Sequence, residues 1–390
     1  MVGCPLCADR RPTACLERNN VPVFQNVRYG SADAARAAAT GRLTVSECRR
    51  CGFVFNATFD PRLAVYSADY ENDQALSARF RAYLDGIAAR VLAAVGNDER
   101  AVVLEIGCGQ AAFLKDLARL SHARFSRFIG FDPAWRGGTT PSALDVRPQL
   151  FDAAAAATLD TRIDAVVSRH VIEHVHDPVQ FLRAIGQAIG PNATPTLMLE
   201  TPSLDWILEH AVAFDFFYEH CNYFTAETLR FALAQAGYRV RKLEHVFDGQ
   251  YLWVEAEPIG DAGATAPTPR GHGAAIKAIG ERGDARLTAW RDTLAAHRRQ
   301  GPIALWGAGA KGTTLAALAD PAGTLIDCLI DINPRKQGGF AAVTAHPVVS
   351  PEAAVARGVR FVVSMNPNYR DEIARTIRAD KLGFDLIDGL

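Results

Sequence analysis

Four cysteines near the start of the chain have the spacing of metal ligands. Cys4 and Cys7 form one Cys-x-x-Cys pair, and Cys48 and Cys51 form a second. Each pair can present two thiolates from a tight turn, and four thiolates fill the tetrahedral shell of Zn²⁺ and leave no open position for water. We therefore expect a structural zinc ion rather than four free thiols, with no part in catalysis and with Cys15 outside the site.

A glycine turn further along the chain has the pattern of a cofactor site. Gly107 and Gly109 follow the apolar run Val102–Ile106 and precede a segment with the period of a helix. Glycines here let a ligand approach the backbone at the carboxyl end of a strand, and Asp132, which ends the next expected strand, can bind ribose hydroxyls. With Glu105 ahead of it, the turn resembles the first motif of class I methyltransferases, which implies S-adenosylmethionine as the cofactor. The alternative is a glycine turn without a ligand.

Three histidines crowd the end of another expected strand, in the segment that runs from Arg169 to Pro178. The segment resembles the one after the fourth strand of the same methyltransferase class, where cofactor and substrate meet. We expect His170 on the cofactor side and His174 on the substrate side. The alternative is that a histidine here only caps a helix or packs against the core.

A carboxylate and an imidazole are embedded in the aromatic run Phe216–Phe224. The run follows Glu200, the residue at the end of the fifth expected strand. Glu219 and His220 are neighbours in it, and apolar surroundings can tune the pKa of such a pair toward that of a general base. The alternative is a hydrophobic segment in which both polar side chains point into solvent.

A second glycine turn, Gly307–Gly312, follows the expected strand Ile303–Trp306. It matches a dinucleotide fingerprint, with Asp331 about 20 residues further on. On its own this turn favours NAD. Small Rossmann-like domains also use such turns without a redox cofactor, and in that case Lys311 would face a diphosphate.

Strands that alternate with amphipathic helices must position these residues. From residue 80 to residue 257 the alternation indicates an α/β fold with an open, mostly parallel sheet, and a smaller α/β sheet carries the second glycine turn. We expect a small zinc-binding module, a methyltransferase core with a class I Rossmann-like sheet, a linker rich in glycine, proline and alanine, and a smaller Rossmann-like substrate domain. These parts would cover residues 1–75, 76–257, 258–275 and 276–390.

The composition suits an enzyme that acts on a small molecule. The 390 residues exceed the usual size of one core, and 49% of them are hydrophobic. Lysine plus arginine number 42 against 43 acidic residues, so no global field attracts nucleic acid or an anionic membrane. No apolar run approaches the roughly 20 residues that cross a bilayer, and no basic segment followed by an apolar one opens the chain. We expect a cytoplasmic protein that is a monomer or a weak dimer.

Taken in order along nearly the whole chain, these motifs resemble those of a known enzyme family. The cysteine pairs, the two glycine turns and the Glu219-His220 segment are similar to those of the sugar C-methyltransferases that act on nucleotide-linked ketosugars, and the likeness includes Asp331–Gln337 and Ser364–Asn366. The resemblance implies a zinc module, a methyltransferase core and a C-terminal domain that together enclose a nucleotide diphosphate sugar.

The resemblance also implies roles for single residues. His220 corresponds to the base of the family, Glu219 to the carboxylate before it, and His174 to a histidine after the fourth strand. A family tyrosine falls on Phe217, with Tyr218 one place away. That departure leaves the stabilisation of an enolate, and therefore the exact substrate, open.

C-methylation needs a ketone beside the methylated carbon and a base that removes the α-proton, after which the enolate attacks the sulfonium methyl group. His220 would be this base, with Glu219 as its orienting partner, and no metal is required at this step. The developing oxyanion would accept a hydrogen bond from Tyr218, Tyr223 or His174.

Further residues are expected around the substrate. Tyr66 and Tyr70, in the stretch that joins the zinc module to the core, would close over the pocket unless they are surface tyrosines. The residues expected to contact the substrate are Tyr70, Glu200, Tyr223, Lys311 and Asn366.

Three alternatives remain open at this point. An O- or N-methyltransferase would keep the same cofactor turn and need only a hydroxyl or an amine to lose its proton. A zinc-organised scaffold protein would carry a vestigial methyltransferase fold, although the intact Glu105–Gly109 turn and Asp132 speak against it. An NAD-dependent enzyme would use the C-terminal glycines.

Overall fold

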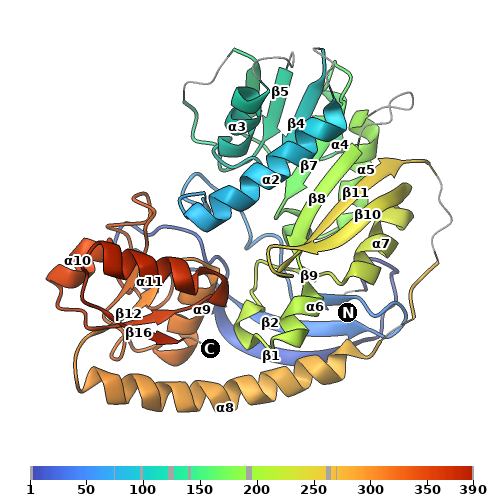
Figure 1. Ribbon diagram of the computed structural model, residues 1–390. Coiled ribbons are helices and arrows are strands. Elements are labelled where there is room, and N and C mark those ends of the chain that lie inside the picture. Colours follow the sequence, from blue (N-terminus) through green and yellow to red (C-terminus); the bar gives the residue numbers. More distant parts are fainter. Residues whose placement is uncertain are drawn as a thin grey trace.

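The computed structural model of the protein describes residues 3–73, 75–96, 100–121, 127–138, 142–189, 196–260, 265–268 and 270–388. Three sheets organise this part of the chain, with seven, four and five strands. Helices lie against them, as Figure 1 shows. The predicted α/β class with Rossmann-like sheets is confirmed.

The largest sheet carries the first glycine turn and has the strand order β10-β11-β8-β7-β4-β5-β6. The strands from β8 to β6 run parallel, and β10 and β11 form an antiparallel hairpin at one edge. All the side chains of β4 are buried, as expected for a central strand that is covered on both faces. The strands are β4 (Val102–Ile106), β5 (Arg127–Phe131), β6 (Leu144–Arg147), β7 (Ala165–Arg169), β8 (Thr196–Pro202), β10 (Tyr238–Val246) and β11 (Tyr251–Pro258).

Helices cover both faces of this sheet. On one face α2 (Ala78–Val95) and α3 (Ala112–Leu120) pack against the side chains of Val103 and Val167. On the other face Leu104 and Val166 share a core with three further helices. These are α4 (Ala153–Ala157), α5 (Pro178–Ile189) and α7 (Ala226–Gln235), and the shorter helices that follow β7 and β8 are η1 (Ile172–His174), α6 (Leu204–Glu209) and η2 (Ala213–Asp215).

The second sheet combines the start of the chain with a segment from its middle. Its order is β1-β2-β3-β9, and all neighbours are antiparallel. The strands are β1 (Pro12–Pro22), β2 (Thr40–Cys48), β3 (Val54–Asn56) and β9 (Asn222–Tyr223), with the short helix α1 (Ala32–Arg36) between β1 and β2. Because β9 begins two residues after His220, the pairing of β9 with β3 ties the Glu219-His220 segment to the N-terminal sheet.

The third sheet carries the second glycine turn and is parallel throughout, in the order β14-β13-β12-β15-β16. Its two faces pack in separate clusters, one with α9 and the other with α10 and α11. The elements are β12 (Ile303–Trp306), α9 (Ala310–Ala319), β13 (Cys328–Ile330), β14 (Val348–Val349), α10 (Pro351–Ala356), β15 (Phe361–Ser364), η3 (Pro367–Tyr369), α11 (Arg370–Ala379) and β16 (Asp385–Asp388).

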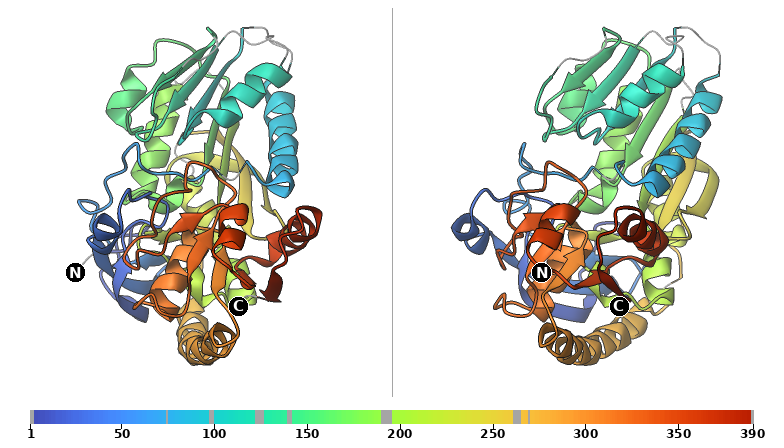
Figure 2. Two further views of the ribbon diagram at one scale, coloured as in Figure 1. Left: turned by 90° about the vertical axis from the view of Figure 1, so that its left-hand side faces the viewer. Right: turned by 60° about the vertical axis from the view of Figure 1, so that its left-hand side comes forward.

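The long helix α8 (His272–Arg298) joins the second and third sheets. Figure 2 shows it in orange below both of them. Its first turns bury Ile276 and Ile279 in the core of the N-terminal sheet, and its later turns bury Leu287 and Leu294 beside the third sheet. The helix begins at His272, so the last four residues of the expected linker are helical. Of the helices described, none is long and apolar enough to cross a membrane.

Candidate active site

Two cavities meet at the ends of the strands that carry the histidine cluster. The first, which we call the β4 cavity, is lined by the turn after β4 and by residues that follow β5 and β7. The second, the β12 cavity, is lined by the turn after β12 and by His220, Phe217 and Trp206. Tyr70, Asn72, Asp73, His170 and His174 line both cavities, so a ligand in one lies beside a ligand in the other.

The β4 cavity has the backbone geometry of an adenosine site. Gly107 and Gly109 have φ angles of +76° and +54°, and a Cβ on Gly107 would lie 2.2 Å from Val171 Cγ2. The backbone N–H groups of Gly109 and Ala134 each donate to Asp132, at 2.7 Å. These bonds hold the carboxylate at the wall of the cavity, and burial raises the pKa of Asp132. Gly107, Gly109, Asp132 and His170, four of the expected cofactor residues, thus surround one cavity.

Glu105, the fifth expected cofactor residue, lies beneath the turn. It is 1% exposed, and its carboxylate accepts a hydrogen bond from Arg169 Nη2 at 3.1 Å. Burial raises the pKa of Glu105, and the neighbouring Arg169 opposes this shift. Glu105 lines neither of the two cavities, so the structure places it as a support for Arg169, which does line the β4 cavity.

His170 is held between two carboxylates. Its Nε2 lies 2.8 Å from Glu200 Oε1, and its Nδ1 lies 3.4 Å from Glu173 Oε1. Burial lowers the pKa of His170, but the two carboxylates outweigh burial and raise it to about 9. The imidazole is therefore protonated at neutral pH. Its backbone has a φ of +55°, in the left-handed region that favours glycine.

Glu200 does not reach the substrate cavity. It is fully buried, it contacts His170 and Tyr83, and it lines neither cavity. The expectation that Glu200 contacts the substrate is contradicted by this placement, because its carboxylate faces the imidazole behind the cavity wall.

His220 faces the β12 cavity in an apolar setting. Its ring lies perpendicular to that of His174, with centroids 4.7 Å apart, and perpendicular to that of Phe217 at 5.0 Å. Burial and the neighbouring His174 lower the pKa of His220 to about 3. The imidazole is therefore neutral at physiological pH and has a nitrogen free to accept a proton.

Glu173 belongs to this cluster, and the sequence analysis missed it. The side chain is 1% exposed and accepts a hydrogen bond from Thr201 Oγ1 at 3.1 Å. Although burial raises the pKa of Glu173, the hydrogen bond with His170 and the other imidazoles lower it to about 2. One ligand atom each from Glu173, His174 and His220 lie within 4.8 Å of one another, which is also a geometry that can hold a metal ion. The position of Glu173 in the sequence, between the expected His170 and His174, could have identified it as a site residue.

Glu219 is buried, so the alternative in which it points into solvent is wrong. It is 1% exposed, and burial raises its pKa. Its Oε2 accepts from the hydroxyls of Tyr70 and Tyr66 at 3.0 and 3.3 Å, and its Oε1 accepts from the backbone N–H of Gln25 at 3.0 Å. These partners place Glu219 under the two tyrosines and beside His174, whose Nδ1 lies 3.1 Å from the Glu219 carbonyl oxygen.

Tyr218 and Tyr223 point away from the substrate. The Tyr218 hydroxyl accepts from the backbone N–H of Asp60 at 2.9 Å, and the Tyr223 hydroxyl donates to the carbonyl oxygen of Phe217 at 2.9 Å. Both rings are buried in the core of the N-terminal sheet, and neither lines a cavity. The expectation that they contact the oxyanion or the substrate is contradicted. Of the three expected donors, His174 is the one that lines the cavities.

The second glycine turn forms the far wall of the β12 cavity. Gly307 has a φ of +112°, and a Cβ on Gly312 would lie 1.9 Å from the Gly307 carbonyl oxygen. The backbone N–H of Ala308 donates to Asp331 Oδ2 at 2.9 Å. Lys311 and Asn366 line this cavity as expected, and the Lys311 ammonium contacts both carboxylate oxygens of Asp215.

The four expected metal ligands are gathered at one point. The Cys4 and Cys51 sulfurs lie 3.6 Å apart, and those of Cys7 and Cys48 lie 3.5 Å apart. All four sulfurs fall within 4.8 Å of one another, and the backbone N–H of Arg50 donates to Cys48 Sγ at 3.4 Å. This donor set fits a tetrahedral zinc ion.

Two domain families match the chain. Residues 76–243 match a methyltransferase domain, and residues 282–382 match the C-methyltransferase C-terminal domain. The chain therefore carries the domains of an S-adenosylmethionine-dependent methyltransferase, and this prediction is confirmed.

Among curated proteins, the chain is similar to the ubiquinone biosynthesis O-methyltransferase of Methylobacterium sp. (strain 4-46), with 34% identity over 97 residues. The match covers 23% of this chain and spans 36% of that relative. Among solved structures, an S-adenosylmethionine-dependent methyltransferase from Mesorhizobium loti has 16% identity and a TM-score of 0.33, over 45% of this chain and 99% of that one. The 1,6-didemethyltoxoflavin-N1-methyltransferase of Burkholderia thailandensis has 17% identity and a TM-score of 0.34, over 46% of this chain and 79% of that one.

Proposed function

We propose that the protein transfers the methyl group of S-adenosylmethionine to a carbon atom of a nucleotide-linked ketosugar. The observation that carries this proposal is His220, a half-buried and neutral imidazole that faces the β12 cavity next to the point where the two cavities join. The match to the C-methyltransferase C-terminal domain supports the same reaction class. Methylation of a hydroxyl or amine could use the same base, so the position of the new methyl group distinguishes the two reactions.

The β4 cavity would hold the cofactor, which supplies an electrophilic methyl group when it is bound. Asp132 would accept hydrogen bonds from the ribose hydroxyls, and the positive φ angles of Gly107 and Gly109 let the ligand approach the backbone. The substrate ketone would lie in the β12 cavity, with its α-carbon between His220 and the methyl group.

His220 would accept the α-proton on a ring nitrogen, and the electron pair of the broken C–H bond would become part of an enolate. The α-carbon of the enolate then forms the new bond to the methyl carbon as the carbon–sulfur bond breaks. Protonated His220 carries a positive charge beside the carboxylate of Glu173, which favours that form. Burial and the neighbouring His174 outweigh Glu173 and keep the pKa of His220 low.

His174 is placed to stabilise the enolate oxygen. The Tyr66 hydroxyl lies 2.7 Å from His174 Nδ1. The Tyr66 proton goes to Glu219 Oε2, and the Glu219 carbonyl oxygen lies 3.1 Å from Nδ1, so Nδ1 is the donor in these contacts. Nε2 would donate to the substrate oxygen when the ring carries a proton on both nitrogens, and His174 would then be the oxyanion donor although Phe217 occupies the position of the family tyrosine.

The nucleotide diphosphate would lie against the second glycine turn. The turn opens α9, so its backbone N–H groups and the ammonium of Lys311 form a positive surface on the β12 cavity. Asn366 lies on the same cavity beside Gln250, with 3.4 Å between the two side-chain amides. Lys311 is paired with Asp215 on the same cavity, so a diphosphate would compete with that carboxylate for the ammonium.

The test is an assay of nucleotide-linked ketosugars with S-adenosylmethionine, in which NMR locates the new methyl group on carbon, oxygen or nitrogen. His220→Asn should reduce kcat by about 100-fold or more and leave the affinity for S-adenosylhomocysteine unchanged, because a positioned base is lost and the β4 cavity is intact. Exchange of the substrate α-proton with solvent, measured without cofactor, should disappear in the same variant. A methyl group on oxygen or nitrogen, or full exchange in His220→Asn, contradicts the proposal.

A further inference from the structure

Residues 66–73, which we call the strap, form the wall between the two cavities. Tyr70, Asn72 and Asp73 line both cavities, and Tyr66 and Tyr70 donate to Glu219. A shift of the strap would therefore change both binding sites and the support of Glu219 at once. The contacts that hold the strap decide how the two sites influence each other.

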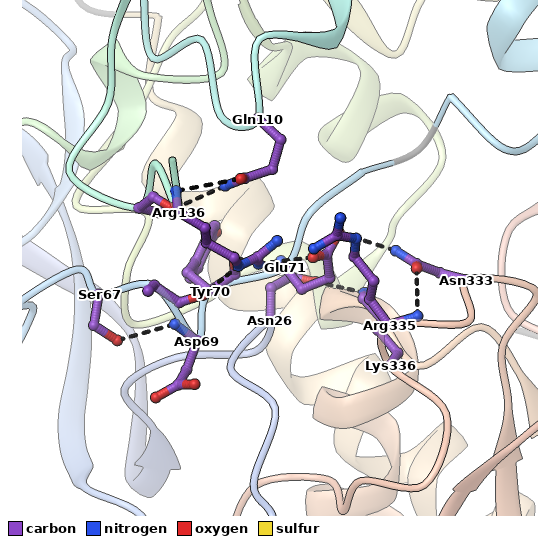
Figure 3. A network of polar contacts seen from close by, with 12 residues as sticks. Asn26, Ser67, Asp69, Tyr70, Glu71, Gln110, Arg136, Asn333, Arg335 and Lys336 are labelled. Carbon is purple, nitrogen blue, oxygen red and sulfur yellow. Dashed lines mark hydrogen bonds and ion pairs between the residues drawn. The ribbon is translucent and has the colours of Figure 1, made fainter. Parts of the chain in front are cut away.

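Arg136 holds the strap from the cofactor side, as Figure 3 shows. Its Nε donates to the carbonyl oxygen of Ala68 at 2.7 Å, and its Nη2 donates to Tyr70 O at 2.9 Å and to Glu71 Oε2 at 2.7 Å. Its backbone N–H lies 3.4 Å from the side-chain oxygen of Gln110, which lines the β4 cavity. A ligand that orders this part of the β4 cavity would therefore also hold the backbone of Arg136 in place.

Asn333 holds the strap from the substrate side. Its Nδ2 donates to Glu71 Oε1 at 3.0 Å, and its backbone N–H donates to Asp331 Oδ1 at 2.8 Å. The other oxygen of Asp331 accepts from Ala308 in the second glycine turn. Glu71, which itself lines the β4 cavity, therefore connects Arg136 to Asn333, a residue that lines the β12 cavity.

Burial makes these contacts strong. Glu71 and Asn333 are each 3% exposed, and the Arg136 side chain is 23% exposed. Hydrogen bonds between charged partners gain strength where water is excluded, and the loss of one partner leaves the other charge unpaired. The strap can therefore move only if both sides of the contact rearrange together.

We infer that Glu71 is a positioning residue that couples the occupancy of the β4 cavity to the order of residues 331–337, which support the second glycine turn through Asp331. It does so by linking Arg136 to Asn333 across the strap, from a position in the lining of the β4 cavity. The inference rests on the placement of the cofactor in the β4 cavity, and it does not depend on which sugar or nucleotide is the substrate.

Hydrogen–deuterium exchange of the full-length protein with S-adenosylhomocysteine tests this coupling. In the wild type, the ligand should slow amide exchange in residues 107–110 and also in residues 66–73 and 331–337, by about fivefold or more. Glu71→Gln keeps the size of the side chain and removes its charge. In this variant the ligand should still slow exchange in residues 107–110, while the response of residues 331–337 should be lost.

Two further variants separate coupling from a general loss of stability. Asn333→Ala removes only the link to the C-terminal domain, so the response should remain in residues 66–73 and be lost from 331–337. Asp69→Asn is the matched control, because Asp69 is an exposed carboxylate on the same strap, and its responses should equal those of the wild type. If Glu71 were merely structural, its replacement would speed amide exchange in the unliganded variant and leave the response to the ligand unchanged.

The coupling is refuted if the ligand slows amide exchange in residues 331–337 equally in the wild type, Glu71→Gln and Asn333→Ala. It is also refuted if the ligand leaves the exchange of these residues unchanged in the wild type. If residues 107–110 do not respond either, the placement of the cofactor is wrong, and the coupling that rests on it is refuted as well. Should Glu71→Gln fail to fold, Asn333→Ala alone decides the question.

Discussion

His170 is charged at neutral pH and lies at the junction of the two cavities. The imidazole gains a proton because Glu173 and Glu200 lie on its two nitrogens, and the three groups together carry one net negative charge when the histidine is protonated. A net negative charge beside His220 favours the protonated form that the proposed base would reach during proton transfer. Glu200, which lines neither cavity, would thus act on the proposed chemistry through His170.

The free energy of unfolding should depend on pH in a way that shows whether His170 carries this charge. The pKa of His170 is about 9 in the folded protein against 6.5 in a model compound, so its contribution to the free energy of unfolding is complete below pH 6.5. The contribution should decline as the pH rises and be lost above about pH 9, a change on the order of 3 kcal/mol. Urea unfolding at closely spaced pH values measures it.

The matched variant for this experiment is His170→Gln. It should remove the part of the pH dependence between pH 6.5 and 9, since glutamine does not titrate. If the free energy of unfolding changes with pH in the same way in His170→Gln as in the wild type, other groups cause the pH dependence. That result would contradict the charged state of His170.

The sequence predicted the residues of the first glycine turn well and those of the Phe216–Phe224 run less well. Gly107, Gly109 and Asp132 come together because the spacing of a strand, a turn and the next strand is local and regular. The directions of Tyr218 and Tyr223 depend on the pairing of β9 with β3, which are far apart in the sequence. No periodicity within the run encodes that pairing, so these two rings could not be placed.

At the scale of elements, the N-terminal sheet serves as a support for the base. β3 pairs with β9, and the Asn56 amide donates to the carbonyl oxygen of Tyr218 at 3.4 Å. The Cys4 and Cys48 turns lie at the end of the same sheet and share a core with the methyltransferase helices. A metal ion at the four cysteines would therefore stabilise the segment that carries His220 as well as its own turns.

We accordingly predict about one zinc ion per chain, bound by Cys4, Cys7, Cys48 and Cys51. Chelation should lower the melting temperature and also reduce kcat, because the β3–β9 pairing loosens. Metal analysis of freshly prepared protein, followed by chelation and thermal unfolding, tests both parts. Cys15→Ser is the matched control and should keep the full metal content, since the Cys15 sulfur donates only to the carbonyl oxygen of Thr13, at 3.1 Å.

Two results would contradict this prediction. One is the absence of zinc from unchelated protein. The other is full retention of zinc after the combined change of Cys48→Ser and Cys51→Ser, because two remaining thiolates cannot complete the site.

At the scale of the whole molecule, three separate parts of the chain line the β12 cavity. The strap, the histidine cluster and the second glycine turn come from different parts of the chain, and α8 packs against both the N-terminal and the C-terminal sheet. The strand and helix pattern predicted each α/β sheet, because hydrophobic periodicity is a local property. The way α8 spans two cores could not be predicted, since its apolar face is compatible with either partner.

Lys311 and Asp215 form the charged contact that joins α9 to the segment before the Phe216–Phe224 run. Their side chains are 15% and 8% exposed, and the ammonium contacts both carboxylate oxygens. Lys311→Ala leaves the carboxylate of Asp215 without its partner, so the free energy of unfolding should fall by about 2–4 kcal/mol, slightly below the range for a fully buried pair. The variant should also raise the KM for the nucleotide sugar, because the positive charge on the cavity is lost.

The double change Asp215→Asn with Lys311→Met separates these two effects. It removes both charges, so the free energy of unfolding should recover most of the loss, while the KM should stay as high as in Lys311→Ala. Urea unfolding and steady-state kinetics on the full-length protein measure the two quantities. If the double variant is as unstable as Lys311→Ala, the buried pair does not explain the stability of this contact. If Lys311→Ala leaves the KM unchanged, the diphosphate binds elsewhere and the second glycine turn serves only to join the C-terminal sheet to the core.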